Sequence, residues 1–488
     1  MKAGALVAAA LVAVLALAGS AAAFDNTEPD AAQQWYLTMD NAWSYWPTMP
    51  TLAPVKVAVI DSGIDYGHPE FRGRIAAGRS FISGSSWKED DDGHGTFVAG
   101  EIAADPTNGY GMAGIAFNAQ LLIAKVVEPD SGSVSLDGEV AAIRWAVAEG
   151  ARVINLSLGG QRDPVDPRLD TYSSAEQAAV EYAYGKGVVV VAAVGNGSES
   201  PSTPWDYADY PAALPHVIGV AALARNGSVP AFSNRDQIYV DLAAPGDDIF
   251  STIPRSLIDT SQPGCAGVPF SNCGPIEFRD AVGTSFAAPQ VSAAAALLLG
   301  VDPKLTPSQV GWLLERSATD ENPSNGCSDC AYGRDSLTGW GRLDIARALT
   351  YLQEGKYPQP DAYEPNDDAG RWAAPFGTPR TIEANVDYWD DPDDVYSISL
   401  RKGQTVFARL TAQKPGKVSL VLWKPGTQTV LGLRAVLSDE AALATAVAGQ
   451  QRLSFVVPAT GVYYLQVKDD APTRWPVEYR LGVAEDTG

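Results

Sequence analysis

Short apolar runs alternate with helix-like segments from residue 55 to about residue 350 of this 488-residue chain. Three of these runs, at 57–60, 152–158 and 188–194, are rich in Val, Ile, Leu and Ala and have the length of buried strands. Strands that alternate with helices pair in parallel, because each crossover helix returns the chain to the same edge of the sheet. The pattern therefore predicts an α/β domain with helices on both faces of a parallel sheet.

Two helices of this region carry end signals. We expect Asp137 to cap a helix over 138–149. We expect Ser174 and Gln177 to form the capping box of the following helix, which Gly185 ends.

Polar residues suited to catalysis stand beside the apolar runs. Asp61 follows the first run, and α/β folds place their sites at the carboxyl ends of strands. His94 lies between two glycines ahead of an apolar helical pattern, and Ser285 opens an alanine-rich run to Leu299 that predicts a buried helix. A helix start favours a developing negative charge, but serine is also an ordinary N-cap. The serine string alone therefore leaves both interpretations open.

Three strings together resemble the catalytic signatures of the subtilisin-like serine proteases (subtilases). They are Asp61-Ser-Gly63, His94-Gly-Thr96 and Gly283-Thr-Ser-Phe-Ala-Ala-Pro289, and they follow the Asp, His, Ser order of that family. A fourth match is the buried run that ends in Gly195-Asn196. The resemblance covers roughly residues 33 to 350 and implies a serine endopeptidase that needs no cofactor for catalysis.

The resemblance also implies a role for each residue. Ser285 is expected to be the nucleophile, His94 the general base and Asp61 the group that orients the imidazole. Asn196 is expected to supply the side-chain donor of the oxyanion hole, supported by Thr284.

The family's specificity pocket has two walls and a peptide-binding edge. The matching segments are Ser157, Leu158 and Gly159 for one wall, Ala193, Val194 and Gly195 for the other, and Ser131, Gly132 and Ser133 for the edge. Small and apolar walls suggest an apolar or broad preference. Asp163 and Asp166 lie just beyond the first wall, so a preference for basic residues stays open.

The loop 105–112 resembles the calcium loop of the family. It implies side-chain ligands from Glu70 and Asn108, and backbone-carbonyl ligands from Asp105, Tyr110 and Met112. Glutamate replaces the usual aspartate at position 70, and an unliganded loop is the alternative.

Two residues after the nucleophile depart from the commonest family pattern. Phe286 stands where a methionine is usual, and Gln290 stands where a histidine is frequent. We expect neither to touch the catalytic residues.

The chain begins with the pattern of a secretory signal peptide, residues 1–23. Lys2 precedes an apolar stretch at 5–18, and Ala21-Ala-Ala23 offers a small-residue cleavage site. A retained anchor helix is the alternative. We find no later segment long and apolar enough to span a bilayer, so we expect a secreted protein without stable membrane insertion.

The net charge of −23 argues against a nucleic-acid partner. It is consistent with the solubility of an exported protein or with attraction of basic polypeptides. We expect protein and peptide substrates and a monomer.

The four cysteines are Cys265, Cys273, Cys327 and Cys330. Export favours disulfides, and the local pairs Cys265–Cys273 and Cys327–Cys330 are the simplest of three pairings. A redox motif or half of a metal site is the alternative for the Cys-x-x-Cys pair.

The peptidase domain is expected at 24–354, followed by a proline-rich linker at 355–370 and a β-sandwich at 371–488. The predicted strands of the sandwich are 395–400, 405–410, 418–423, 453–457 and 462–467. This part resembles the pre-peptidase C-terminal domain of secreted proteases, on the strings at 361–367, 393–398 and 461–465. Its acidic run, Asp390, Asp391, Asp393 and Asp394, is either a calcium site or a solvated loop.

The leading hypothesis is a secreted serine endopeptidase. A dedicated processing protease of exported precursors is a second interpretation, and an inactive subtilase-like binding or adhesion protein is a third. The presence of all four expected catalytic residues weighs against the third.

Overall fold

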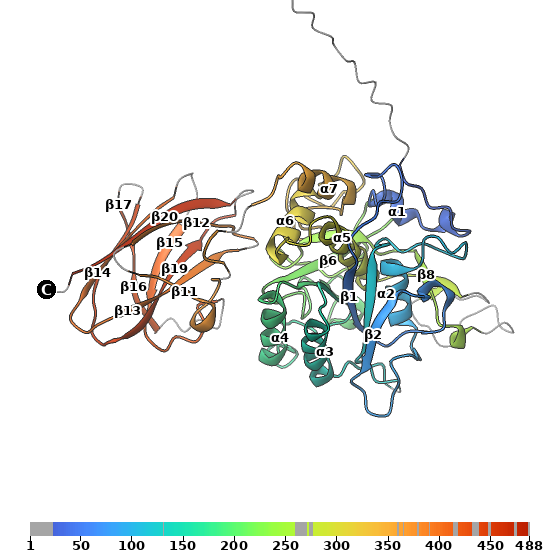
Figure 1. The fold of residues 1–488 in the computed structure, drawn as a ribbon, viewed down its shortest axis with the longest axis horizontal. Helices are drawn as coiled ribbons and strands as arrows, with labels where there is room; N and C mark the ends of the chain where they lie inside the picture. The colour runs from blue at the N-terminus through green and yellow to red at the C-terminus, as the bar shows by residue number, and fades with distance from the viewer. Residues whose placement is uncertain are drawn as a thin grey trace, which may run out of the picture.

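The computed structural model places the chain in two units, one blue to yellow and one orange to red (Figure 1). The structure describes residues 23–129, 131–258, 271–272, 277–358, 361–364, 366–377, 380–389, 391–412, 418–431, 439–447, 450–472 and 476–486. The predicted signal peptide, apart from its last residue, therefore lies outside the described residues, and so do Cys265, Cys273 and Asp390. Cys327 and Cys330 are joined in a disulfide.

A seven-stranded sheet of order β2-β3-β1-β4-β5-β6-β7 forms the centre of the first unit. Every pair of neighbours in it is parallel, as the sequence predicts. The strands are β1 (Val55–Asp61), β2 (Ile75–Ser80), β3 (Ala119–Lys125), β4 (Val153–Leu156), β5 (Val189–Ala193), β6 (Val217–Leu223) and β7 (Leu242–Pro245). A small sheet of order β8-β10-β9 joins Ile249–Thr252, Phe278–Ala281 and Ser271–Asn272.

Helices cover both faces of the large sheet (Figure 1). The α-helices are α1 (Trp35–Met39), α2 (His94–Ala103), α3 (Leu136–Ala148), α4 (Ser174–Tyr184), α5 (Ala288–Val301), α6 (Pro307–Ser317) and α7 (Ile345–Gln353). The 3-10 turns are η1 (Ala31–Gln33), η2 (Pro69–Phe71), η3 (Gly197–Glu199), η4 (Arg255–Leu257), η5 (Thr284–Phe286) and η6 (Gly370–Trp372).

The alternation of side chains along β1 separates two hydrophobic cores. Val57 and Val59 pack with residues of α2 and α5, whereas Ala58 and Ile60 pack with residues of α3 and α4. Successive strand residues point to opposite faces, so a strand covered on both sides is apolar throughout. Burial of each valine or isoleucine side chain contributes about 1.5–3 kcal/mol.

The helix caps differ from the sequence prediction. Ser135, not Asp137, caps α3 by accepting a hydrogen bond from the N–H of Gly138. Ser173, not Ser174, caps α4 by accepting one from the N–H of Glu176. Neighbouring residues with cap chemistry compete for one position, and the packing of each helix on the sheet decides which of them is used.

The helix that follows the serine string is buried along its length. Among the described residues, the stretch Thr284–Val301 is apolar enough and long enough to cross a membrane, but 89% of it is buried inside the domain. It is therefore the core helix that the alanine-rich run predicts. Our expectation that no segment after the signal peptide is long and apolar enough to span a bilayer was therefore wrong for this stretch.

The second unit is built from two sheets that share one core. Their orders are β11-β13-β19-β15-β16 and β12-β20-β14-β18-β17. The strands are β11 (Ala374–Pro375), β12 (Arg380–Val386), β13 (Asp393–Leu400), β14 (Thr405–Ala412), β15 (Val418–Trp423), β16 (Glu440–Leu443), β17 (Thr445–Val447), β18 (Gln450–Val456), β19 (Gly461–Asp469) and β20 (Val477–Asp486). All pairings but β11–β13 are antiparallel, and all five predicted strands are present.

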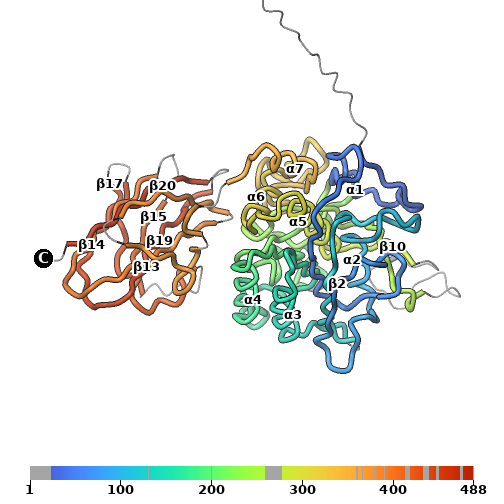
Figure 2. The backbone as a smooth tube through the Cα atoms, viewed as in Figure 1, coloured from blue at the N-terminus to red at the C-terminus, as the bar shows by residue number. Residues whose placement is uncertain are grey.

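The two units are distinct in the chain trace (Figure 2), and side chains of one contact the other. The guanidinium of Arg316 on α6 lies 3.0 Å from a carboxylate oxygen of Asp387 in the second unit. The guanidinium of Arg334 lies 3.7 Å from the ring centre of Trp389. In the segment predicted as a linker at 355–370, Ala369 is buried against residues of β13 and β15 in the second unit.

Candidate active site

Three neighbouring strands end at one edge of the large sheet. β1 ends at Asp61, β4 leads into the wall segment 157–159, and β5 leads into 193–196. Because β1 pairs with β4 and β4 pairs with β5, these ends lie side by side. The sheet thus brings together residues that are far apart in the sequence.

His94 begins α2 and faces Asp61. Its Nδ1 lies 2.8 and 3.0 Å from the two carboxylate oxygens of Asp61, which is 2% exposed. The close approach of α2 to β1 requires Gly95, because a Cβ there would overlap the carbonyl oxygen of Gly63 and lie 3.2 Å from the Cβ of Asp61. Since Nδ1 is held by Asp61, Nε2 is the ring nitrogen left to exchange a proton.

Asp90 fixes the start of α2, and we did not identify it from the sequence. One of its carboxylate oxygens accepts hydrogen bonds from the hydroxyl of Ser62 and the N–H of Gly93, both at 2.8 Å. The other accepts from the N–H and the hydroxyl of Thr96, at 2.8 and 2.5 Å. The hydroxyl of Ser62 lies in turn 2.8 Å from the N–H of Gly95. The only sequence signal is the run of aspartates before His94, which also describes a solvated loop.

Nearby carboxylates set the pKa of His94. Burial lowers it, but the charges of Asp61, Asp92 and Asp90 and the hydrogen bond to Asp61 outweigh burial and raise the pKa to about 9. The same carboxylates therefore stabilise the imidazolium that forms when His94 accepts a proton.

Ser285 lies in the turn η5, just before α5, rather than in the α-helix itself. Its hydroxyl donates to the carbonyl of Ser157 at 3.2 Å, and the hydroxyl of Ser157 donates to the carbonyl of Ser285 at 2.7 Å. Behind them, the amide of Asn155 donates to the Ser157 hydroxyl at 2.9 Å and accepts from Ser292 at 2.8 Å. This buried chain locks the first wall to the candidate nucleophile.

Thr284 orients the side chain of Asn196. The Thr284 N–H and hydroxyl lie 3.0 and 3.2 Å from the side-chain oxygen of Asn196. A backbone N–H can only donate, so the facing atom of Asn196 must be its oxygen. The Nδ2 hydrogens are therefore available on the other side of the amide.

Phe286 does touch a catalytic candidate, contrary to our expectation. Its ring centre lies 5.4 Å from that of His94 and 4.5 Å from that of Phe97, and the side chain is 1% exposed. The α2 and α5 helices pack across this aromatic contact, a long-range effect that the local sequence does not reveal. Gln290 instead joins the same two helices, with its amide nitrogen 3.1 Å from a carboxylate oxygen of Glu101.

The other predicted substrate-binding residues lie around this edge. The exposed residues 131–133 form the tip of a turn after β3, in which the N–H of Glu128 donates to the carbonyl of Ser133 at 2.9 Å. That turn is anchored beside the site, since the N–H of Val126 donates to the carbonyl of Asp61 at 2.8 Å. Ala193 and Val194 are buried, whereas Leu158, Gly159 and Gly195 keep part of their surface exposed.

The side chains expected to bind calcium meet at the loop 105–112. Both carboxylate oxygens of the buried Glu70 accept hydrogen bonds, one from the amide of Asn108 at 2.8 Å and one from the N–H of Met112 at 3.0 Å. Burial, together with the charges of Glu28 and Asp105, raises the pKa of Glu70 to about 8. A buried carboxylate beside an amide and further acids is a donor set that fits Ca²⁺.

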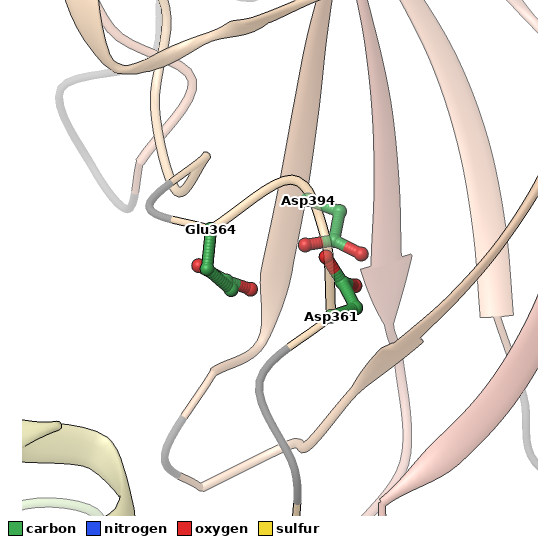
Figure 3. A group of neighbouring side chains, drawn as sticks. All are labelled: Asp361, Glu364 and Asp394. Carbon is green, nitrogen blue, oxygen red and sulfur yellow. The ribbon is translucent and has the colours of Figure 1, made fainter. Parts of the chain in front are cut away.

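The described residues of the acidic run do not form one site. Asp393 accepts a hydrogen bond from the amide of Gln466 at 2.7 Å and belongs to neither of the two groups of carboxylates described below. Asp394 instead meets Asp361 and Glu364 (Figure 3). In each of two groups, the three carboxylates bring one oxygen apiece within 4.8 Å of one another, and the groups are Asp361, Glu364 and Asp394, and Glu364, Asp367 and Asp391. Asp394 is fully buried, so a solvated loop does not describe it.

Comparison with known proteins identifies the family. The sequence profile of the subtilase family matches residues 53–341. The chain belongs to the subtilase family.

Named relatives agree with this assignment. Subtilisin DY of Bacillus licheniformis is 37% identical over 268 residues, which cover 55% of this chain and 85% of that protein. Thermitase of Thermoactinomyces vulgaris is 35% identical, covering 50% of this chain and 74% of that protein. This subtilase is therefore a serine-type endopeptidase.

A solved structure shares the fold. The crystal structure of a lanthipeptide protease superposes with a TM-score of 0.52 at 24% identity, covering 66% of this chain and 95% of that one. At this identity the likeness concerns the fold alone.

The histidines of this subtilase offer a test of the electrostatics. The chain has only three, so protein labelled with ¹⁵N-histidine gives few imidazole signals. We predict that His94 titrates near pH 9, and that His216, whose pKa burial lowers to about 4, titrates in acid. Asp92→Asn removes an anion that favours the imidazolium and should move the His94 titration to lower pH, measured by NMR.

Asp137→Asn makes the same change of charge at an exposed position on α3 and serves as the control. It should leave the titration of His94 in place. A His94 signal that titrates near its ordinary pKa of 6.5, or that moves to higher pH in Asp92→Asn, would contradict this description.

Proposed function

We propose that Asp61, His94 and Ser285 are the catalytic triad of a secreted endopeptidase that cleaves proteins and peptides. The observation that carries the proposal is the pair of short contacts between His94 Nδ1 and the buried Asp61 carboxylate. Asp61 fixes the tautomer in which Nε2 acts as the base, and it stabilises the imidazolium that forms.

The reaction begins when the Ser285 hydroxyl turns from the Ser157 carbonyl toward Nε2 of His94. His94 takes the proton as Ser285 attacks the substrate carbonyl, and later returns it to the leaving amine. Water then attacks the acyl-enzyme. His94 takes a proton from this water and returns it to the oxygen of Ser285 as the acid product leaves. The Nδ2 of Asn196 and the N–H of Ser285 stabilise the oxyanion, in the orientation that the contacts of Thr284 with Asn196 support.

The substrate backbone is proposed to pair as an added strand. Residues 157–159 form one side of its site and residues 131–133 the other, with 193–195 closing the pocket for the side chain before the cleaved bond. The contact of Ser157 with Ser285 supports this, since it sets the first wall directly beside the nucleophile.

We further propose that the protein acts as a monomer outside the cell, without stable membrane insertion and without a nucleic-acid partner. The signal-like pattern at 1–23 and the net charge of −23 support this. The sheet pairing of residues 371–488 is consistent with a pre-peptidase C-terminal-like domain.

A dedicated processing protease would use the same centre but cleave few proteins, and an inactive adhesion protein would cleave none. Hydrolysis of fluorescent casein separates these alternatives from a general endopeptidase. We expect casein to be cleaved.

Three variants test the proposed roles. Ser285→Ala should abolish casein hydrolysis while the fold is kept, because the triad acts as a unit. Asn196→Ala should lower kcat about 10²–10³-fold with little effect on KM, which is the loss that removal of the equivalent donor causes in subtilisin. Thr284→Val keeps the backbone donor to Asn196 and should cause a smaller loss. Full casein hydrolysis by pure Ser285→Ala protein would refute the mechanism.

We propose that calcium stabilises both units. In the first, Glu70 and Asn108 would hold it with the carbonyls of Asp105, Tyr110 and Met112. In the second, Asp361, Glu364, Asp367, Asp391 and Asp394 would hold it. The second proposal is supported by Asn366, a fully buried residue in the same segment whose amide has no hydrogen-bond partner among the described residues.

Melting curves test this proposal. An ion that binds only the native state adds about 2.7 kcal/mol at a hundredfold excess over its Kd. EDTA should therefore lower the melting temperature of the wild type, and excess calcium should restore it. Glu70→Gln and Glu364→Gln should each remove part of that difference. Identical wild-type curves in EDTA and in calcium would show that neither site binds the ion.

A further inference from the structure

Asp209 lies between the two wall segments, although we did not identify it from the sequence. Its N–H donates to the carbonyl of Val194 in the second wall at 2.9 Å. The next residue, Tyr210, exchanges two backbone hydrogen bonds of 2.8 Å with Gly160, at the end of the first wall. Asp209 and Tyr210 thus bridge the walls where the β4–β5 pairing has ended.

One glycine of each wall lies against Asp209 or its neighbour Tyr210. A Cβ on Gly195 would overlap a carboxylate oxygen of Asp209 and lie 2.6 Å from the amide nitrogen of Asn234. A Cβ on Gly159 would lie 2.7 Å from the carbonyl of Tyr210 and 3.5 Å from the Cβ of Asp209. Gly159 is exposed, Gly195 is partly exposed and Asp209 is only 5% exposed, so the Asp209 carboxylate lies deeper than the two glycines, at a position that we name the floor.

Asn234 adds a second polar group to the floor. It is fully buried, and neither atom of its side-chain amide has a hydrogen-bond partner among the described residues. Its N–H donates to the carbonyl of Gly195 at 3.1 Å, which fixes it beside the second wall. The carboxylate oxygens of Asp209 are acceptors, and they match the donors of an ammonium or guanidinium group.

We propose that Asp209 makes this protease selective for lysine or arginine at P1, the residue whose carbonyl Ser285 attacks. The inference rests on the proposed function and names the substrate class of its pocket. A carboxylate at the floor of a protease pocket selects a cationic P1 side chain. The net charge of −23 favours approach of such substrates as well.

This proposal differs from the apolar preference that the small walls suggest. It also assigns a basic preference to Asp209 rather than to Asp163 and Asp166, the two aspartates beyond the first wall. Asp163 accepts hydrogen bonds from the N–H groups of Val165 and Asp166 in its own loop. Asp166 pairs with Arg168. Both carboxylates are therefore engaged within their own loop.

The test compares peptide p-nitroanilides that differ only at P1, which is arginine, citrulline, lysine, phenylalanine or leucine. Citrulline has the shape of arginine without the charge. The wild type should cleave the arginine substrate about ten- to hundredfold faster than the citrulline substrate, in kcat/KM, as expected for hydrogen bonds to a charged group. Asp209→Asn should abolish that ratio.

Matched variants control for the change of charge. Asp163→Asn and Asp166→Asn each remove one nearby carboxylate and should keep the wild-type ratio. Asp209→Glu keeps the charge and should keep a preference for arginine over citrulline. For the wild type alone, benzamidine, an aryl cation, should inhibit competitively, and neutral benzamide at the same concentration should not.

The outcomes separate this inference from the proposed function. Cleavage of phenylalanine and leucine substrates with no preference for arginine over citrulline would overturn the role of Asp209 and leave the triad in place. The same holds if Asp209→Asn keeps the wild-type ratio. Failure to cleave any of the five substrates, by enzyme that also fails to cleave casein, would instead overturn the proposed function.

Discussion

Parallel pairing of β1, β4 and β5 is the constraint on which the rest of the site depends. It sets Asp61 beside the segment after β4, and that segment beside the one that leads to Asn196. The helices then complete the site, because α2 carries His94 to Asp61 and the turn before α5 carries Ser285 to Ser157. No single segment holds the chemistry, so the site exists only when the sheet is formed.

Buried polar contacts hold these pieces at fixed positions. Asp90 binds four groups at the start of α2, and the chain from Ser292 through Asn155 and Ser157 reaches Ser285. Such networks are costly when incomplete and rigid when satisfied. Rigidity matters for the role that we propose for Asn196, because an oxyanion donor contributes most when it needs no rearrangement during the reaction.

The sequence predicted those features that depend on local patterns or on family signatures. The parallel strands, the buried helix after Ser285, the Cys327–Cys330 disulfide and five strands of the second unit belong to this class. It did not predict contacts between distant segments, such as that of Phe286 with His94 or the position of Asp209 between the walls. The caps Ser135 and Ser173 were missed because Asp137 and Ser174, close by in the sequence, carry side chains that can also cap a helix.

The central claim is that Ser285 is the activated nucleophile of this protein. Reaction of the whole chain with a fluorophosphonate, followed by peptide mass spectrometry, tests it most directly. We predict one adduct, on Ser285, that is lost when the protein is unfolded before labelling. No adduct on the folded protein, or an adduct on a different serine, would contradict it.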